Sequence, residues 1–180
     1  MWTGKFKIMA KLIFDSDGLI KLTKSGVIEV ILVKFECFIS EEVCKESVID
    51  GMDRLYEDAF LIDSFIERKL LTVKKFNEDE NAKNIMKETK SIGMGERSTL
   101  HLFFNLGASA IVSDDYTFLK LLPKNKIPFI IPTDLIAELA VLNILTKESA
   151  LSALEKIKPW VKENNYQTSK RYLENINKNK

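Results

Sequence analysis

The stretch LIFDSDGLI, residues 12–20, joins an apolar run to two closely spaced carboxylates. The apolar run predicts a short buried strand over 11–14, which Asp15 closes. The pattern over 18–25 predicts a helix that ends near Gly26. Acidic residues at such a strand-to-helix junction are common in proteins that act on phosphate groups, so this stretch bears on function as well as on fold.

The same alternation of short strands and helices continues along the chain. Because helical crossovers join parallel strands, it predicts an α/β fold with a short, mostly parallel central sheet and helices on both faces. Ligands of such folds bind beyond the carboxyl ends of the strands, so acidic residues there are the functional candidates. Further strands are expected over 37–39, 71–73, 110–112 and 128–131, and helices over 27–33, 41–50, 54–68, 78–91, from 96, up to 122, and from 133.

The composition is that of an ordinary globular domain. The chain has 180 residues, 46% of them hydrophobic and 29% charged, with a formal net charge of +1. Affinity for nucleic acid therefore cannot rest on overall charge and needs a local site. Cys37 and Cys44 lack the spacing of a zinc site and are expected to be reduced core thiols. We see neither a signal peptide nor a membrane span, so a cytoplasmic protein is expected.

Several acidic residues meet the expectation for a site at the strand ends. Asp15 closes the first strand, and Asp115 follows the strand over 110–112. Glu96 opens a helix whose apolar stripe includes Leu100 and Phe103, which lie on the same face. A carboxylate on such a face is costly unless something pairs with it.

Glu46 completes this set on the helix expected over 41–50. Val43 and Ile49 lie three residues to either side, so the spacing predicts that Glu46 shares their apolar face. Together the acids suit a hard cation such as Mg²⁺ or Mn²⁺, which could activate water and stabilise charge on a phosphoryl group. Taken singly, Asp17, Asp114 and Glu96 are equally well explained as residues that stabilise helix N-termini.

Two known families share part of this pattern. FDSDG at 14–18 resembles the first motif of haloacid-dehalogenase-like phosphatases, which would make Asp15 a nucleophile and Asp17 a general acid. Leu19 departs from that motif, where threonine or valine is usual. No strand ending in serine or threonine followed by a lysine motif is found where that family requires it.

The longer resemblance is to the PIN domain, the fold of VapC-type toxins and related nucleases. It runs from about residue 11 to about residue 160, and it implies a PIN-like three-layer α/β/α sandwich with a helical C-terminal extension. The matching segments are the opening strand with Asp15, SEEVCKE with Glu46, GMGERSTLHL with Glu96, IVSDDYTFLKLL with Asp115, and the tail from PTDLIAEL to ALEKI.

The resemblance implies a metal-dependent ribonuclease that cleaves single-stranded RNA by metal-activated water, with Mg²⁺ or Mn²⁺ as cofactor. It also suggests the toxin of a toxin–antitoxin pair, with an antitoxin protein as a candidate partner. A non-catalytic RNA-binding or scaffold protein on the same fold is the remaining alternative. The catalytic and metal-binding candidates are Asp15, Glu46, Glu96 and Asp115, assisted by Asp114 and Asp17, with Ser113 and Arg97 as candidate contacts to a ligand or substrate.

We divide the chain into an N-terminal extension over 1–10, a PIN-like nuclease domain over 11–160 and a basic tail or helix over 161–180. No role is assigned to the extension. The tail is a candidate RNA-contacting edge, with Tyr166 and Tyr172 as candidate stacking residues. The helices from 133 bear more apolar residues than one face can use, which predicts a homodimer.

Overall fold

The computed structural model describes residues 10–87 and 92–176. The extension expected before residue 10 and the end of the helix expected over 78–91 lie almost wholly outside the described residues. At the centre is a five-stranded sheet with the order β3-β2-β1-β4-β5, in which every neighbouring pair is parallel. Its strands are β1 (Lys11–Phe14), β2 (Glu36–Ser40), β3 (Leu71–Lys74), β4 (Ala110–Val112) and β5 (Phe129–Ile130).

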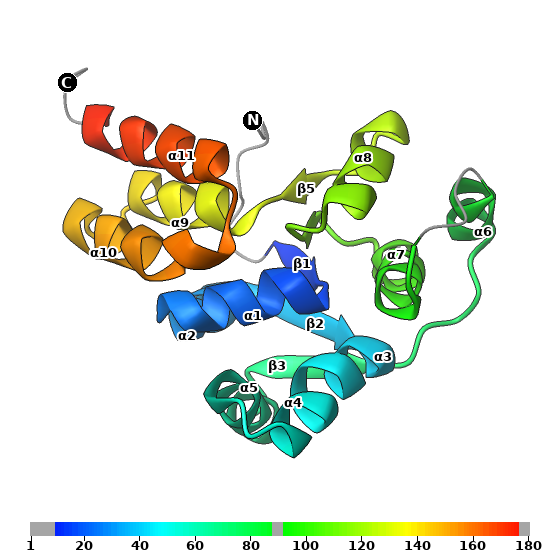
Figure 1. Ribbon diagram of the computed structural model, residues 1–180. Coiled ribbons are helices and arrows are strands. Elements are labelled where there is room, and N and C mark those ends of the chain that lie inside the picture. The colour runs from blue at the N-terminus through cyan, green and yellow to red at the C-terminus, as the bar shows by residue number, and fades with distance from the viewer. Residues whose placement is uncertain (1–9, 88–91, 177–180) are drawn as a thin grey trace.

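Helices cover both faces of this sheet and form the outer layers (Figure 1). The α/β class and the parallel sheet are therefore confirmed, as is the three-layer arrangement. The helices are α1 (Ser16–Ser25), α2 (Ile28–Lys34), α3 (Glu41–Cys44), the π-helical turn η1 (Lys45–Ile49), α4 (Asp50–Asp53), α5 (Glu57–Glu67), α6 (Glu80–Met86), α7 (Met94–Leu106), α8 (Tyr116–Lys124), α9 (Pro132–Val141), α10 (Lys147–Ile157), the 3₁₀ turn η2 (Lys158–Trp160) and α11 (Glu163–Asn175).

Two hydrophobic cores fill the space between the layers. Side chains alternate across each strand, so Leu12 and Phe14 of β1 join one core and Ile13 joins the other. The larger core packs the sheet against α1, α2, α5 and α9–α11, and the smaller one packs it against α6, α7 and α8. Burial on both faces explains why the strands are almost continuously apolar in sequence.

The C-terminal helices belong to this packed structure. Helix α11 packs against α9 and α10, and Tyr166 is only 1% exposed, with its hydroxyl donating to Glu155. The expectation that Tyr166 could stack on RNA is therefore wrong. Its position on the inner face of α11 was not evident, because the surrounding sequence is strongly polar.

The helix bearing Glu46 differs from its expected form. The segment from α3 through η1 to α4 is helical throughout, but a π-helical turn interrupts it at Lys45–Ile49. Regular α-helical spacing predicted a common buried face for Val43, Glu46 and Ile49, yet Ile49 is 55% exposed whereas Val43 is buried. The wider turn changes which side chains meet the core, so the apolar face expected for Glu46 is wrong.

Two further expectations concern the cysteines and membranes. Cys37 and Cys44 are free thiols, and burial raises the pKa of Cys37, as suits an inert core position. Within residues 10–87 and 92–176, no helix has the length and apolar character needed to cross a membrane.

Candidate active site

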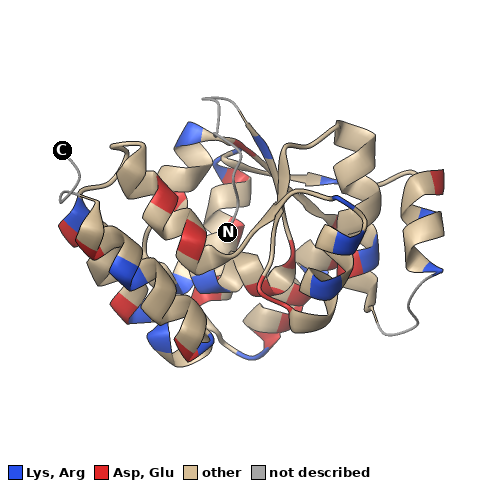
Figure 2. Ribbon diagram, turned by 90° about the horizontal axis from the view of Figure 1, so that it is seen from above, with Lys and Arg blue, Asp and Glu red and all other residues tan. Residues whose placement is uncertain are grey.

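The candidate acids lie at the edge where the parallel strands end. Strands β1 and β4 are neighbours at the centre of the sheet, and the chain runs outward from them in opposite directions through β2 and β5. This reversal is the topological switch point, where open parallel sheets form their ligand-binding crevice. In Figure 2, acidic ribbon segments group near the middle of the molecule.

Asp15 stands at the end of β1 and caps α1. Its backbone N–H donates to the Val112 carbonyl at 3.2 Å, and one carboxylate oxygen accepts from the Gly18 N–H at 2.7 Å. A Cβ at Gly18 would lie 2.5 Å from the Val112 oxygen, so only glycine fits between this helix and β4. The close packing of α1 against β4 thus explains the glycine at position 18 without a phosphatase motif.

The carboxylate of Asp15 is buried without a cationic partner among the described residues. The side chain is 3% exposed, and desolvation raises its pKa to about 8, although hydrogen bonds from Ser113 and Gly18 oppose that rise. The nearby charges of Asp17 and Glu96 raise it further. A carboxyl group in such a position favours protonation or the arrival of a cation.

Asp115 enters the site from the end of β4. Its carboxylate caps α8 by accepting from the Phe118 N–H at 2.7 Å. Ser113 joins the two strand ends, because its hydroxyl donates to Asp15 and accepts from the Asp115 N–H at 3.2 Å. Ser113 is fully buried, so it fixes both acids against the sheet.

Glu46 and Glu96 approach from two helices that pack together. Glu46 projects from the π-helical turn and accepts from the Ser16 hydroxyl. Glu96 lies in the first turn of α7. A Cβ at Gly95 would lie 2.6 Å from a Glu46 carboxylate oxygen, so the glycine leaves room for Glu46 beside Glu96. The hydroxyl groups of Ser40, which caps α3, and Ser98, on α7, lie 2.6 Å apart and are hydrogen-bonded, which links the start of α3 to α7.

The carboxylates from these separate segments line one cavity of about 110 Å³. Within the described ranges, no lysine or arginine forms an ion pair with Asp15, Glu46, Glu96 or Asp115. We call this cavity the acidic cavity. Its lining residues are Asp15, Ser16, Asp17, Glu46, Gly95, Glu96 and Asp115.

The donor set of the acidic cavity fits a hard divalent cation. Its ligands are carboxylate and hydroxyl oxygens, which Mg²⁺ and Mn²⁺ prefer. No three carboxylate, histidine or cysteine side chains of residues 10–87 and 92–176 converge closely enough to hold an ion as they stand. Asp15 and Glu46 are instead hydrogen-bonded to Ser113 and Ser16, so binding would require side-chain rotation toward the cavity centre.

Asp17 and Asp114 have a different environment from the other acids. Lys21 bridges them, at 2.6 Å from Asp17 and 2.8 Å from Asp114. Burial lowers the pKa of Lys21, but its hydrogen bonds to the two carboxylates outweigh burial and leave the pKa raised. We call these three residues the lysine bridge. Sequence reasoning missed Lys21, although its spacing of four residues from Asp17 on a helix was a usable signal.

Arg97, the remaining candidate, and His101, the single histidine of the sequence, are not among the residues that line the acidic cavity. The Arg97 side chain donates from Nε to the Ile92 carbonyl at 3.2 Å, so part of its guanidinium is committed to the loop before α7. His101 stacks on Phe76 with ring centroids 4.9 Å apart, and its Nδ1 accepts from the Asp79 N–H. These contacts give His101 a packing role between α6 and α7.

Comparisons with known proteins agree with this geometry. A family model described as a PIN domain matches residues 11–175, which includes every helix and strand from β1 to α11. Among curated proteins, none matches the chain. Since the family model covers most of the sequence, the chain belongs to the PIN domain family.

Proposed function

We infer that this chain acts as PIN domains generally do: they are nucleases, which are hydrolases, and they typically use divalent metal ions. The haloacid-dehalogenase alternative loses its basis, because the family match extends over the whole fold and Gly18 has a packing role. The choice that remains lies between a catalytic PIN domain and a non-catalytic one.

We propose that this protein is a metal-dependent endoribonuclease that hydrolyses single-stranded RNA with Mg²⁺ or Mn²⁺. One observation carries the proposal: Asp15, Glu46, Glu96 and Asp115, from four separate segments, line the acidic cavity, and none of these four forms an ion pair in the described part of the chain. Mutually repelling carboxylates destabilise a fold unless a ligand offsets their repulsion. A scaffold protein would have no need to keep such a cluster.

The proposed roles follow from the position of each side chain. Asp15, Glu46, Glu96 and Asp115 would hold the ion, and the charges of Asp17 and Asp114 would assist. When bound, a divalent ion supplies a Lewis acid for a phosphoryl oxygen and for water. Ser113 holds the Asp15 carboxylate against β4, and Ser16 holds the Glu46 carboxylate near the N-terminus of α1. These hydrogen bonds hold the two carboxylates in the metal-free protein, and both would have to break as the side chains turn toward an ion.

Cleavage of a fluorescently labelled single-stranded RNA tests the proposal. Full-length protein stripped with EDTA should be inactive and should regain cleavage when Mn²⁺ or Mg²⁺ is added. Asp15→Asn should abolish this cleavage while circular dichroism stays unchanged. Asp53→Asn, which alters an exposed carboxylate on α4, is the matched control and should retain activity. Full activity in Asp15→Asn would overturn the assignment.

Thermal unfolding gives a second readout that does not depend on activity. A ligand at 100 times its dissociation constant stabilises a fold by about 2.7 kcal/mol. Saturating Mn²⁺ should therefore raise the Tm of the wild type by several degrees and that of Asp15→Asn by much less. RNA binding without cleavage or metal stabilisation would instead identify the non-catalytic alternative.

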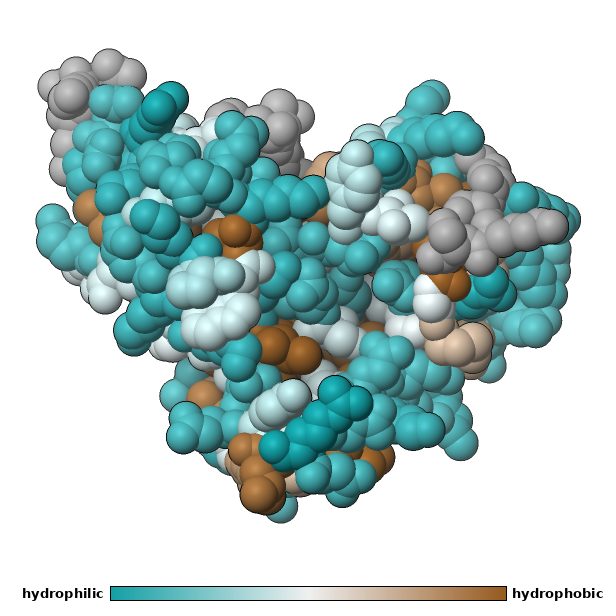
Figure 3. Space-filling model, viewed as in Figure 1, coloured by the Kyte–Doolittle hydropathy of each residue, from teal (hydrophilic) through white to brown (hydrophobic). Residues whose placement is uncertain are grey.

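The proposal includes a role as the toxin of a toxin–antitoxin pair in the cytoplasm, with an antitoxin as partner. Exposed apolar residues Leu55, Tyr56 and Leu61 line a shallow cavity beside α5, where brown side chains gather at the bottom of Figure 3. Such a surface is typical of protein contacts. Growth arrest on expression, abolished by Asp15→Asn, tests the toxin role.

The homodimer stays a prediction. Most of the apolar surplus that suggested it is used inside the chain, because Leu135, Ile136 and Leu139 of α9 are fully buried. Val141 and Leu142 at the end of that helix remain partly exposed. Light scattering on the purified protein measures the oligomeric state directly.

A further inference from the structure

A second feature lies beside the acidic cavity, at the start of α8. Tyr116 directly follows Asp115, and its side chain is 56% exposed. Two ammonium groups lie over its ring: Lys120 Nζ is 4.1 Å from the ring centroid and Lys162 Nζ is 4.0 Å from it. An exposed aromatic ring with two cations is thus fixed next to a carboxylate of the acidic cavity.

The two lysines come from different parts of the chain. Lys120 lies one turn along α8, whereas Lys162 precedes α11. In the part of the chain that the structure describes, no acidic side chain forms an ion pair with either of them. Their charges lower the pKa of the Tyr116 hydroxyl, with a hydrogen bond from Lys120 as the largest cause. The fold therefore maintains positive charge at an exposed aromatic surface.

A groove continues from this position along the edge of the sheet. It has a volume of about 860 Å³ and lies between α8 and β5 on one side and α11 on the other. Figure 3 shows the surface hollowed between these parts of the molecule. Lys162 lines the groove and also contacts Tyr116, while Asn165 lines it and donates to Asp114 at 3.5 Å. These two residues join the groove to the site.

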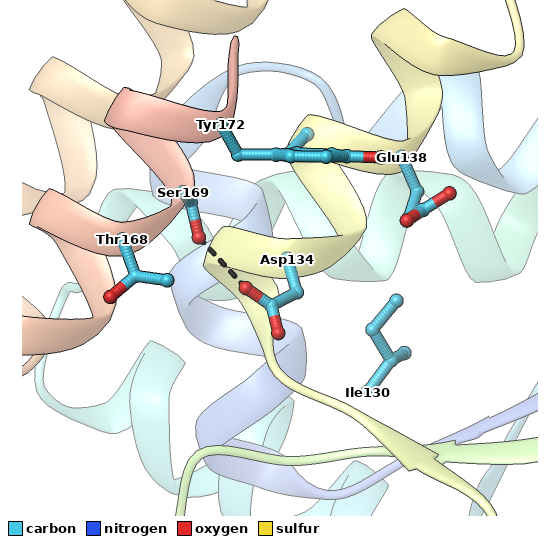
Figure 4. Close-up of a pocket in the computed structure, with 7 residues that line it drawn as sticks. Ile130, Asp134, Glu138, Thr168, Ser169 and Tyr172 are labelled. Atoms are coloured by element: carbon cyan, nitrogen blue, oxygen red, sulfur yellow. Dashed lines mark hydrogen bonds between the residues drawn. The ribbon is translucent and has the colours of Figure 1, made fainter. Parts of the chain in front are cut away.

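The lining of the groove offers hydrogen-bond donors above an apolar floor. Ile127 and Ile130 form part of that floor, and Lys126, Asn164 and Thr168 stand along the walls. Asp134, whose carboxylate accepts from the Ser169 hydroxyl at 2.8 Å, stands at the seam between α9 and α11 (Figure 4).

Acidic side chains at this seam reduce the attraction of the groove for a polyanion. Glu138 lies one turn beyond Asp134 on α9, and burial together with the Asp134 charge raises its pKa. Asp134, which lines the groove, would therefore repel a polyanion near α9 more than the readily protonated Glu138, whereas the lysines at Tyr116 would attract it.

We propose that Tyr116, Lys120 and Lys162 form a subsite for single-stranded RNA that flanks the acidic cavity, and that the strand continues into the groove between α8 and α11. The inference rests on the proposed function for the identity of the polymer. Lysines that neutralise phosphates and an aromatic ring that stacks on a base are the two components of single-strand recognition. A base within a duplex is already stacked on both sides, which disfavours double-stranded RNA.

The subsite would also position the substrate. A phosphate drawn between Lys120 and Lys162 displaces their ammonium groups from the ring and exposes it to the adjacent base. Because Tyr116 follows Asp115 in the chain, a nucleotide held there places the neighbouring phosphodiester toward the acidic cavity. The carboxylates alone would repel that phosphate, so the flanking lysines supply the attraction that brings it close.

Fluorescence anisotropy tests the subsite without cleavage. Wild-type full-length protein in EDTA is titrated into a labelled single-stranded RNA of about 12 nucleotides, a length in the range of known single-strand sites. Tyr116→Leu should weaken binding by about 30-fold, the middle of the range for loss of one stacked base. Tyr116→Phe and Tyr116→Trp should bind nearly as well as the wild type. The logarithm of the RNA-binding constant falls linearly with the logarithm of the salt concentration. Lys162→Met and Lys120→Met should each reduce the slope of that line by about one.

Matched variants control for general effects. Tyr56→Leu alters an aromatic residue of similar exposure beside α5. Lys34→Met alters an exposed lysine just before β2, at the amino ends of the parallel strands and so away from the carboxyl ends that carry the acidic cavity. Both should bind RNA like the wild type.

The outcomes separate the subsite from the ribonuclease proposal. Unchanged binding in Tyr116→Leu and Lys162→Met overturns the subsite, even if metal-dependent cleavage is observed. Weakened binding in both variants, with no cleavage in any metal, supports the subsite and rejects the ribonuclease. A wild type that does not bind RNA in EDTA overturns the subsite, and cleavage in Mn²⁺ then decides the ribonuclease proposal separately.

Discussion

The acidic cavity and the lysine bridge both contain carboxylates at the carboxyl ends of the strands, yet the charges around these carboxylates differ. In the lysine bridge, one ammonium group contacts both Asp17 and Asp114. In the acidic cavity, Asp15 is as buried as Asp114, but it accepts hydrogen bonds only from neutral groups. The fold thus supplies a cation to Asp17 and Asp114 and none to Asp15 among the described residues.

This difference separates carboxylates that stabilise the fold from carboxylates that await a ligand. A paired acid retains its charge without outside help, and its removal is mainly a structural change. An unpaired acid in a cavity costs stability, and a cost of this kind is typical of functional sites. Three experiments on the two regions follow, from the largest expected effect to the smallest.

The largest difference is expected in cleavage. Glu96→Gln removes a carboxylate of the acidic cavity and should lower the rate of RNA cleavage by at least about 100-fold, since metal stabilisation of a phosphoryl group is worth several kcal/mol. Asp114→Asn, in the lysine bridge, should lower it by less than about tenfold. The rate at saturating Mn²⁺ measures both, and equal losses would show that the two regions act as one site.

The next effect concerns stability. Lys21→Met leaves Asp17 and Asp114 facing each other without a cation, and Asp114 is buried. Removal of one partner from a buried ion pair costs about 3–5 kcal/mol, and the partial exposure of Asp17 should bring the loss to about 2–4 kcal/mol.

Urea unfolding in EDTA measures this loss. The double variant Lys21→Met/Asp114→Asn should recover part of it, because it removes the buried charge that Lys21→Met leaves unpaired. No loss in Lys21→Met would mean that the bridge contributes nothing to the fold.

The smallest effect is the pH dependence of the metal-free protein. The pKa of Asp15 is raised from 3.8 to about 8 in the folded state, so folding favours the protonated form. Below about pH 4 the group is neutral in both states, and stability is then lost as the pH rises toward 8.

Asp15→Asn removes this dependence. Between pH 4 and pH 8 the free energy of unfolding of the variant should therefore rise relative to that of the wild type, by a few kcal/mol at most. Urea midpoints in EDTA at pH 5 and pH 8.5 measure the gain, with Asp53→Asn as control. Added Mn²⁺ should reverse the order, because the wild type alone gains a bound ion. A constant difference at both pH values would contradict the raised pKa.

The parallel sheet could be predicted closely from the sequence. Buried parallel strands are short apolar runs, and such runs stand at each of the five positions found in the fold. Helix α3 begins at Glu41 with Ser40 as its cap, as expected, whereas α1 begins at Ser16, two residues before its expected start, with Asp15 as its cap. Helix α9 begins at Pro132, one residue before its expected start at 133.

The parts that could not be predicted depend on geometry that spacing does not encode. The π-helical turn exposes Ile49 against the expected periodicity. Lys21 pairs with Asp114 across the sheet edge, a contact between residues far apart in the chain. The cluster around Tyr116 likewise needs Lys162, which reaches it only because α11 packs beside α9.

The π-helical turn also has a consequence for the comparison of related sequences. Each residue of a regular helix advances the side-chain direction by about 100°. A relative with one residue fewer between Cys44 and Asp50 would form a regular helix there, and the carboxylate aligned with Glu46 would face away from Gly95. In this segment the number of residues, and not only their identity, thus determines whether a carboxylate faces Gly95.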